Sequence, residues 1–152
     1  MTTTPYDNRT IIERNLATVR AFLAGTHSRN LVDLDAIDTT VAPNIVCHGF
    51  PGGDPDSHES YKQFFRVFQS SFSDMAFRTE AMVGNERFVS ARWSIECKFT
   101  GPFAGLEPTG QTVNFDGMVL YRLEDGLIAE TWLHINELAL LGQIGALPAL
   151  AA

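Results

Sequence analysis

Residues 86–136 read ERFVSARWSIECKFTGPFAGLEPTGQTVNFDGMVLYRLEDGLIAETWLHIN, and this stretch decides the fold. Apolar residues recur at every second position through three long runs, which is the period of a half-buried strand. Turn signals divide the runs at 107–110 and at 124–126, where glycine supplies the positive φ that a tight turn needs. The stretch therefore predicts a curved antiparallel sheet with one apolar face, which helices elsewhere in the chain must cover.

The rest of the chain supplies those helices and two further strands. Asp56 or Ser57 can cap one helix, and Asn136 can cap another that Gly145 then ends. Apolar residues at spacings of three and four define the helices, whereas short apolar runs indicate strands. The expected helices span about 8–25, 31–37, 58–72 and 137–144, and the additional strands span 44–50 and 75–83.

The helices gather early in this order and the strands gather late. That arrangement is typical of an α+β fold with the helices on one face of the sheet. The length of 152 residues is that of one domain. We expect a single domain over residues 8–146, with loose tails at 1–7 and 147–152.

Composition and charge limit the compartment and the partners. The net charge of −7 argues against nucleic acid and anionic membranes, because phosphate groups are bound by clustered Lys and Arg. No apolar stretch approaches the roughly 20 residues of a membrane helix, and the N-terminus lacks a signal-peptide pattern. Cys47 and Cys97 form no CxxC motif, so buried free thiols are favoured over a disulfide. These features predict a cytoplasmic protein.

Motifs for nucleotide binding, metal-dependent proteolysis, calcium binding and serine hydrolysis are absent from the sequence. The four histidines show no helical pairing, so we expect no metal and no cofactor. Asp33, Asp35 and Asp38 lack the glycine and closing glutamate of a calcium loop and are interpreted as solvated or capping residues. His48 is the candidate catalytic base, because it shares a face with Val46 and Phe50 directly before a Gly/Pro loop that would rim a cavity. The alternative is a histidine hydrogen-bonded in that loop.

Strand alternation assigns an inside and an outside to each long strand. Met118, Leu120 and Trp132 fall outside and form an apolar patch, which predicts a homodimer through the convex face of the sheet. The inward set comprises Val89, Ala91, Trp93, Ile95, Cys97, Phe99, Phe115, Gly117, Val119, Tyr121, Ala129, Thr131, Leu133 and Ile135.

The helix expected at 58–72 has an aromatic residue at every position of its apolar stripe. Core packing is the favoured interpretation of such a stripe. The functional interpretation is the wall of an aromatic-lined cavity, and both can hold at once. The stripe consists of Tyr61, Phe64, Phe65, Phe68 and Phe72.

Several short motifs together resemble the SnoaL-like polyketide cyclases of the nuclear-transport-factor-two-like, or cystatin-like cone, superfamily. The resemblance covers roughly residues 10–146. It implies a curved antiparallel sheet forming a cone, closed by three to four helices on the concave face and usually found as a dimer. The motifs are Val46-x-His48, Arg92-Trp93, Thr100-Gly101, Pro108-Thr109-Gly110, Phe115-x-Gly117, Tyr121-Arg122-x-Glu124-Asp125-Gly126-x-Ile128-x-Glu130-x-Trp132 and Leu140-Leu141-Gly142-Gln143-Ile144-Gly145.

The resemblance also implies a cofactor-free ring closure driven by acid/base residues inside the cone. Those residues would stand two positions after Gly117 and directly after Trp132. This chain has Val119 and Leu133 there, and neither aliphatic side chain can move a proton. The family's usual mechanism is therefore not expected. The related epoxide hydrolases place an aspartate at the Leu133 position and are disfavoured for the same reason.

Two hypotheses about function follow. In the first, the cone binds a small, largely apolar molecule, and any chemistry is that of a cofactor-independent cyclase, isomerase or lyase acting on a polyketide-like or terpenoid-like substrate through His48. In the second, the chain is a non-catalytic ligand-binding or assembly module that has lost the acid/base pair. A cavity of about 300 Å³ or more containing His48 would favour a small-molecule site. The expected ligand-binding residues are Tyr61, Phe68, Trp93, Phe115, Val119, Tyr121, Thr131 and Leu133.

Overall fold

The computed structural model describes residues 5–29 and 33–147. Its elements in chain order are α1 (Pro5–Thr26), α2 (Ala36–Thr40), β1 (Val41–His48), α3 (His58–Ser71), β2 (Phe72–Gly84), β3 (Phe88–Phe99), β4 (Thr112–Glu124), β5 (Leu127–Ile135) and α4 (Glu137–Ile144). The α+β class is confirmed, and so is the order of helices and strands. The predicted tails lie largely outside the described residues, although α1 already begins at Pro5.

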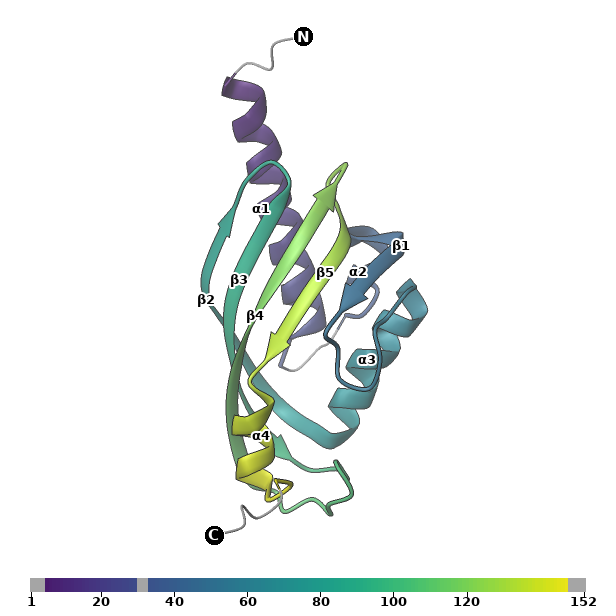
Figure 1. Cartoon of the computed structure of the whole chain (residues 1–152), viewed down its shortest axis with the longest axis vertical. Coiled ribbons are helices and arrows are strands. Elements are labelled where there is room, and N and C mark those ends of the chain that lie inside the picture. Colours follow the sequence, from purple (N-terminus) through teal and green to yellow (C-terminus); the bar gives the residue numbers. More distant parts are fainter. Residues whose placement is uncertain (1–4, 30–32, 148–152) are drawn as a thin grey trace.

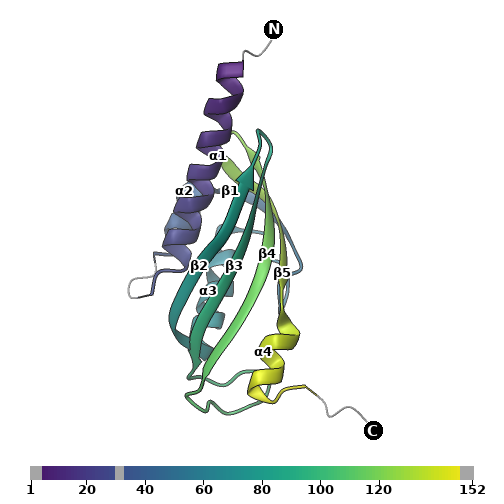
Figure 2. The same ribbon diagram turned by 90° about the vertical axis from the view of Figure 1, so that its left-hand side faces the viewer.

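The strands form one sheet in the order β1-β5-β4-β3-β2. All neighbours are antiparallel except β1 and β5, which pair in parallel. Figures 1 and 2 show the long strands twisting together, with α1 and α3 packed across one face. We call this the inner face, and the opposite, convex side the outer face. None of the helices in the described part of the chain is long and apolar enough to cross a membrane.

The tight turn between β4 and β5 is confirmed. Asp125 has φ 50° and Gly126 has φ 79°, the pair of positive angles that a two-residue hairpin turn requires. The connection from β3 to β4 is a longer loop over 100–111, so the prediction of a tight turn at 107–110 is wrong. The N–H groups of Thr100 and Gly101 donate to the carbonyl of Ser71, which draws the chain across the end of α3 before it enters β4.

Other predicted boundaries move by a few residues. The short helix lies at Ala36–Thr40, later than the expected 31–37, of which 31–32 lie outside the described residues. Close packing on α1 explains this position, because a Cβ at Gly25 would meet that of Ala36. The strands β1 and β2 begin earlier than expected, since each follows a helix with no linker.

The helix ends follow the predicted capping residues. Ser57 caps α3 in a reciprocal capping box with Ser60. Asn136 caps α4, and Gly145 ends that helix in the left-handed conformation at φ 78°. The side chain of Gln143 then fastens α4 to β4, because it accepts from the backbone N–H of Asn114 and donates to its carbonyl. These local bonds set where the helices start and stop.

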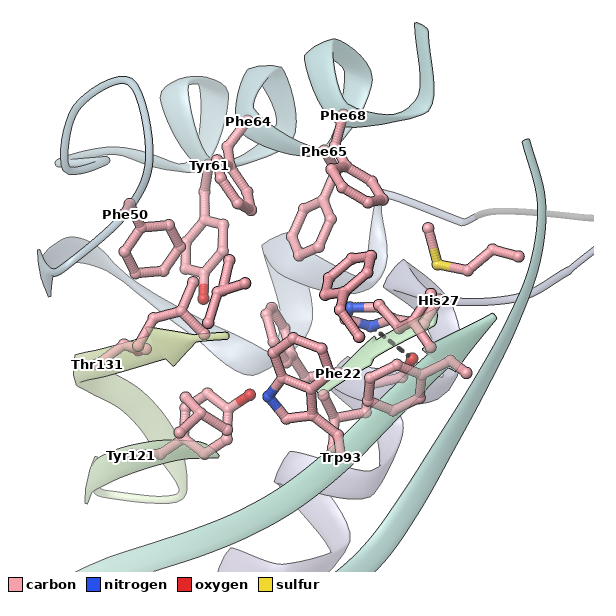
Figure 3. Close-up of a pocket in the computed structure, with 18 residues that line it drawn as sticks. Phe22, His27, Phe50, Tyr61, Phe64, Phe65, Phe68, Trp93, Tyr121 and Thr131 are labelled. Atoms are coloured by element: carbon pink, nitrogen blue, oxygen red, sulfur yellow. Dashed lines mark hydrogen bonds between the residues drawn. The ribbon is translucent and has the colours of Figure 1, made fainter. Parts of the chain in front are cut away.

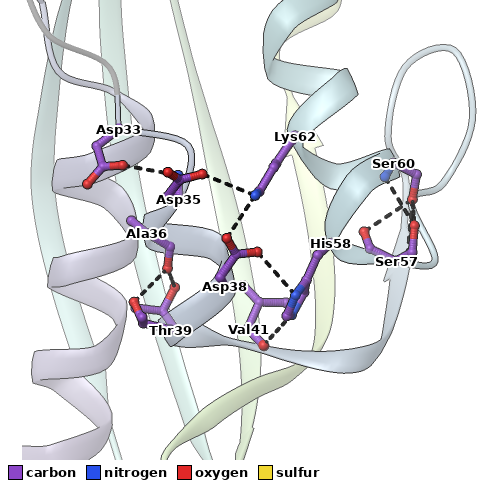
Figure 4. Close-up of polar contacts among 11 residues, drawn as sticks. Asp33, Asp35, Ala36, Asp38, Thr39, Val41, Ser57, His58, Ser60 and Lys62 are labelled. Atoms are coloured by element: carbon purple, nitrogen blue, oxygen red, sulfur yellow. Dashed lines mark hydrogen bonds and ion pairs between the residues drawn. The ribbon is translucent and has the colours of Figure 1, made fainter.

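A polar cluster joins α2 to α3 (Figure 4). Lys62 Nζ lies 3.2 Å from Asp35 Oδ1 and 2.8 Å from Asp38 Oδ2, and its hydrogen bond lowers the pKa of Asp38. Asp33 accepts a hydrogen bond from the N–H of Asp35. All three aspartates are exposed. Asp35 and Asp38 form ion pairs with Lys62, whereas Asp33 accepts a local backbone hydrogen bond. Among the described residues, no group of three or more His, Cys, Asp and Glu side chains is placed to hold a metal ion.

Alternation predicted the inner and outer faces correctly. The inner residues of β3 are buried from Val89 to Phe99, whereas Met118 and Leu120 on the outer face of β4 are 52% and 37% exposed. Cys47 is buried as a free thiol, as is Cys97. Burial raises the pKa of both thiols to about 12, so neither is a reactive thiolate near neutral pH.

Candidate functional site

A cavity of about 60 Å³ lies between the inner face of the sheet and the helices α1 and α3. Figure 3 shows the side chains that line it converging from both layers. Most are aromatic or aliphatic, and none of these lining residues is Asp, Glu, Lys or Arg. The lining consists of Phe22, Leu23, His27, Phe50, Tyr61, Phe64, Phe65, Phe68, Met75, Phe77, Trp93, Ile95, Phe115, Val119, Tyr121, Thr131, Leu133 and Ile135.

The aromatic stripe of α3 serves both as core and as cavity wall. Tyr61 and Phe65 stack with their ring centroids 5.6 Å apart, and Phe22 meets Tyr61 edge-on at 5.4 Å. Phe64 and Phe68 are only partly buried and also line the cavity. The rings thus pack in the offset and edge-to-face arrangements that aromatic pairs prefer, while leaving a space between the layers.

All eight predicted ligand-binding residues line this cavity. The inward prediction for Val119 and Leu133 is correct, and the two residues pair directly across β4 and β5. The two positions at which the family resemblance implies acid/base groups are therefore aliphatic and face the interior. Whether a ligand contacts the eight residues stays a prediction.

His48, the predicted catalytic residue, is not among the lining residues. Along β1, Ile45 and Cys47 are buried, whereas Val46 is exposed and the side chain of His48 is 43% exposed. The prediction that Val46, His48 and Phe50 share a face at the cavity is wrong. Only Phe50 turns inward, because Gly49 at φ 82° interrupts the alternation after the strand ends.

On the outer face His48 belongs to a charged network. Its Nε2 lies 2.7 Å from Glu130 Oε2, and its ring stacks on Trp132 at 5.3 Å. Arg122 donates to the other carboxylate oxygen of Glu130. The His48 hydrogen bond and that from Arg122 lower the pKa of Glu130. His48 thus has surface partners on β5 and not in the loop, and it does not line the cavity, so its catalytic role stays a prediction.

His27 is the polar lining residue that the sequence did not predict. The apolar lining residues that were not predicted either are Phe22, Leu23, Met75 and Phe77. His27 follows the end of α1, beyond the glycine expected to stop that helix. The available signal was its spacing of four from Leu23, which continues the apolar stripe of the helix. The ring stacks on Phe77 at 4.1 Å and meets Phe65 edge-on at 5.3 Å. Burial lowers the pKa of His27 to about 4, so the imidazole is neutral at pH 7.

Three hydroxyl-bearing side chains stand apart from His27 in Figure 3, namely Tyr61, Tyr121 and Thr131. Tyr121 and Thr131 pair across β4 and β5. Burial raises the pKa of both tyrosines well above the usual range, so they stay protonated. Thr131 is fully buried, and within the described part of the chain its Oγ1 has no hydrogen-bond partner.

A second apolar chamber of about 120 Å³ adjoins the cavity beneath α3 and α4. Phe64, Phe68, Phe115 and Ile135 line both spaces and form the wall between them. The first cavity alone is smaller than the 300 Å³ expected for a small-molecule site, and it does not contain His48.

Comparison with known proteins agrees with this architecture. AclR from Streptomyces galilaeus is 25% identical with a TM-score of 0.78, over 92% of this chain and 86% of its own. A SnoaL-like protein from Jannaschia Sp. CCS1 is 22% identical with a TM-score of 0.81, over 97% and 99%. IdmH from Streptomyces antibioticus is 24% identical with a TM-score of 0.73, over 86% and 98%.

No curated protein matches the chain. The family model of the SnoaL-like polyketide cyclases, however, matches residues 10–144, which is most of the sequence. The five-stranded sheet, its helices and the interior cavity are consistent with that match. The chain belongs to the SnoaL-like polyketide cyclase family.

Proposed function

We propose that the chain binds a small, largely apolar molecule inside the cone. The observation that carries this proposal is the composition of the cavity: an interior lined by aromatic rings, with a few polar groups and no charged side chain among its lining residues. Small-molecule sites are built in this way, with apolar walls and a few polar groups that fix orientation. An apolar ligand gains from leaving water, and the rings offer it a large contact surface.

A ligand larger than the first cavity can bind only if the wall between the two chambers moves. The two spaces measure about 60 and 120 Å³, and together they exceed the roughly 150 Å³ in which an apolar protein cavity holds benzene. Opening the wall formed by Phe64 and Phe68 would add the volume of the displaced rings. We therefore expect a ligand of one or two rings, bound with a change in the rotamers of these two side chains.

Trp93 offers a direct test of binding, because it lines the cavity and shares the chain with one other tryptophan, Trp132. In a Trp132→Phe variant, toluene and camphor should change the emission of Trp93 in a saturable way. Val119→Phe, which fills the cavity from β4, should abolish this change while circular dichroism stays native. His48→Ala on the outer face is the matched control and should bind as before. Absence of a saturable response to both probes would contradict the proposal.

A cofactor-free cyclisation, isomerisation or lyase reaction is the second candidate function, and the position of His27 favours it. The family's two acid/base positions hold Val119 and Leu133, and the buried tyrosines stay protonated. His27 is thus the lining group with a nitrogen able to take a proton from a bound ligand.

Proton abstraction can be measured without knowing the substrate. Acetophenone incubated in D₂O should exchange its methyl hydrogens faster with the wild-type protein than with His27→Phe. In that exchange a C–H proton passes to the imidazole nitrogen, leaving an enolate that takes up deuterium. Equal exchange rates would leave the non-catalytic binding function as the better account.

We further propose that the outer face forms a homodimer. Met118 and Leu120 are 52% and 37% exposed, and they lie with Trp132 in one shallow apolar groove. Exposed apolar patches of this kind mark interaction surfaces. Residues of the same groove include Arg92 and Asp116, which lie 3.8 Å apart and give the rim charges of both signs. A self-complementary twofold contact can use such a rim.

A further inference from the structure

We propose that the cone selects an uncharged molecule carrying a hydroxyl group, which donates a hydrogen bond to Nε2 of His27, while Thr131 holds an oxygen atom elsewhere on the same molecule. The inference rests on the proposed binding function and names the class of ligand. It follows from the hydrogen bonds already made around the two side chains and from their positions on opposite sides of the cavity.

The surroundings of His27 determine which ring nitrogen carries the proton. Thr26 Oγ1 lies 2.8 Å from Phe22 O, and a carbonyl can only accept, so the hydroxyl proton of Thr26 is used there. Nδ1 of His27 lies 2.8 Å from Thr26 Oγ1 and 3.3 Å from Leu23 O. Both neighbours therefore act as acceptors toward Nδ1, which must carry the hydrogen. Nε2 is left with a lone pair.

The imidazole of His27 lies between the cavity and an open groove formed by α1 and β2, and it lines both. Figure 3 shows the imidazole reaching from the end of α1 into the group of lining side chains. No hydrogen bond to Nε2 is formed by the described residues, whose contacts with His27 are through Nδ1 and through the faces and edges of Phe65 and Phe77. A neutral imidazole in this tautomer is an acceptor, so its natural partner is a ligand O–H or N–H.

Thr131 supplies an independent sign of a ligand. Its side chain is fully buried, and its Oγ1 has no hydrogen-bond partner among the described residues. The hydroxyl of Tyr61 is nearby, but it does not complete a hydrogen bond to that oxygen. Buried hydroxyls are almost always paired. A carbonyl or ether oxygen of a bound molecule would satisfy this one.

The two polar positions lie at opposite sides of the cavity. His27 stacks on Phe77 of β2, at one edge of the sheet, and Phe77 in turn stacks on Trp93 of β3. Thr131 is on β5, which is separated from β3 by β4. The aromatic walls lie between the two positions, so the matching ligand is apolar in the middle and polar at two places.

The lining also excludes charge. Among the described residues, no Asp, Glu, Lys or Arg lines the first cavity, and Glu137 is the one charged residue beside the second chamber. His27 is neutral at pH 7 because burial lowers its pKa. A charged ligand would lose its hydration without gaining an opposite charge, which is strongly unfavourable. Aromatic rings can attract a cation through their faces, but many rings here present faces and edges to one another. An uncharged ligand fits the site better.

Matched probes of similar size test the inference on the Trp132→Phe background. Phenol carries a donor, acetophenone carries an acceptor alone, and toluene carries neither. We expect phenol and acetophenone each to bind about fivefold more tightly than toluene, the gain of one net hydrogen bond. Benzoate and benzylammonium should not bind.

Two substitutions assign the two contacts. His27→Phe keeps an aromatic ring but removes the acceptor, so it should cost phenol about fivefold in affinity and leave toluene unchanged. Thr131→Val keeps the shape but removes the hydroxyl, so it should weaken acetophenone alone. If toluene binds as tightly as phenol, or if His27→Phe weakens all three probes equally, the inference fails while the binding function stands. If no probe binds, both fail.

Ring ¹⁵N spectroscopy gives a second readout that does not depend on affinity. In the free protein at pH 7, Nδ1 of His27 should show the shift of a protonated nitrogen and Nε2 that of a bare one. Phenol should move the Nε2 resonance toward the protonated value, whereas toluene should not. A protonated Nε2 in the free protein would overturn the assignment.

Discussion

On β5, Thr131 and Leu133 face an interior lined by aromatic rings, whereas the residues beside them, Glu130 and Trp132, face the outside of the sheet. The inner face of the sheet carries the cavity, with no charged side chain among the residues that line it. The outer face carries the charged network around Glu130 and the exposed Met118 and Leu120. A shift of one residue along a strand therefore decides whether a side chain faces the cavity or the outer face.

Two histidines show the same contrast. His48 is on the outer side of β1, where its ring is hydrogen-bonded to Glu130 and stacks on Trp132. His27 is on the inner side at the end of α1, where one nitrogen is used by the helix and the other is not. The difference shows that a strand position next to a loop does not by itself indicate whether a side chain lines the cavity.

The largest expected effect comes from the inner face. Phe22 is 1% exposed and contacts the rings of Tyr61, Phe65 and Tyr121. Phe22→Ala should lower the free energy of unfolding by about 3–5 kcal/mol, because it removes buried area and enlarges the cavity. Urea denaturation measures this. Val67→Ala, at an exposed position of α3, is the control and should change little. Equal losses for both variants would remove the distinction between the packed interior and the exposed side of the helices.

The next effect depends on pH. The pKa of His27 is lowered by burial from 6.5 to about 4 in the folded state. Between these values the unfolded chain takes up a proton that the folded chain does not bind, so stability falls as the pH falls from about 6.5 to 4. Relative to His27→Phe, the wild type should lose roughly 2 kcal/mol over this range. Urea denaturation at both pH values measures this. An equal change in the free energy of unfolding for the two proteins would contradict the prediction.

A smaller effect, of the opposite sign, is expected at Thr131. Removing a buried hydroxyl that has no partner relieves its desolvation, so Thr131→Val should raise the free energy of unfolding by about 1 kcal/mol. Thermal unfolding without ligand checks this prediction. Thr131→Ser, which keeps the hydroxyl, should not be stabilised. A loss of stability in Thr131→Val would mean that the hydroxyl is already satisfied in the folded protein.

The smallest effect on stability is expected on the outer face. Replacing Met118 and Leu120 by lysine should change the free energy of unfolding of one subunit by less than about 0.5 kcal/mol, since both side chains are exposed. The same change should convert a dimer to a monomer in light scattering, because two charges would be buried at the contact. Val67→Lys on α3 is the matched control. An unchanged mass would argue against this interface.

Much of the fold could be predicted because it depends on local patterns. Alternation identified Trp93, Phe115 and Tyr121 as inward, and the spacing of Tyr61 and Phe68 placed them on one side of a helix. Capping residues such as Ser57 and Asn136 marked helix starts from their own hydrogen bonds. Those patterns were enough to collect all eight predicted residues around one cavity.

The errors arose where distant segments meet. The loop after β3 is held by hydrogen bonds to the carbonyl of Ser71, and the sequence of the loop itself does not predict these bonds. The turn at Gly49 points His48 and Phe50 in different directions, although a spacing of two residues predicts one face for both. His27 joined the cavity because α1 happens to end against Phe65 and Phe77.

The amino-acid order alone determined the class of fold, the two faces of each long strand and the aliphatic character of Val119 and Leu133, because each depends on residue type and on the periods of strand and helix. The tertiary structure decided which histidine lines the cavity, which buried hydroxyl among the described residues lacks a partner, and how large the cavity is. Those properties depend on contacts between α1, β2 and β5, segments that lie far apart in the chain. Side-chain direction and hydrogen-bond partners at such contacts are set only when the layers pack together.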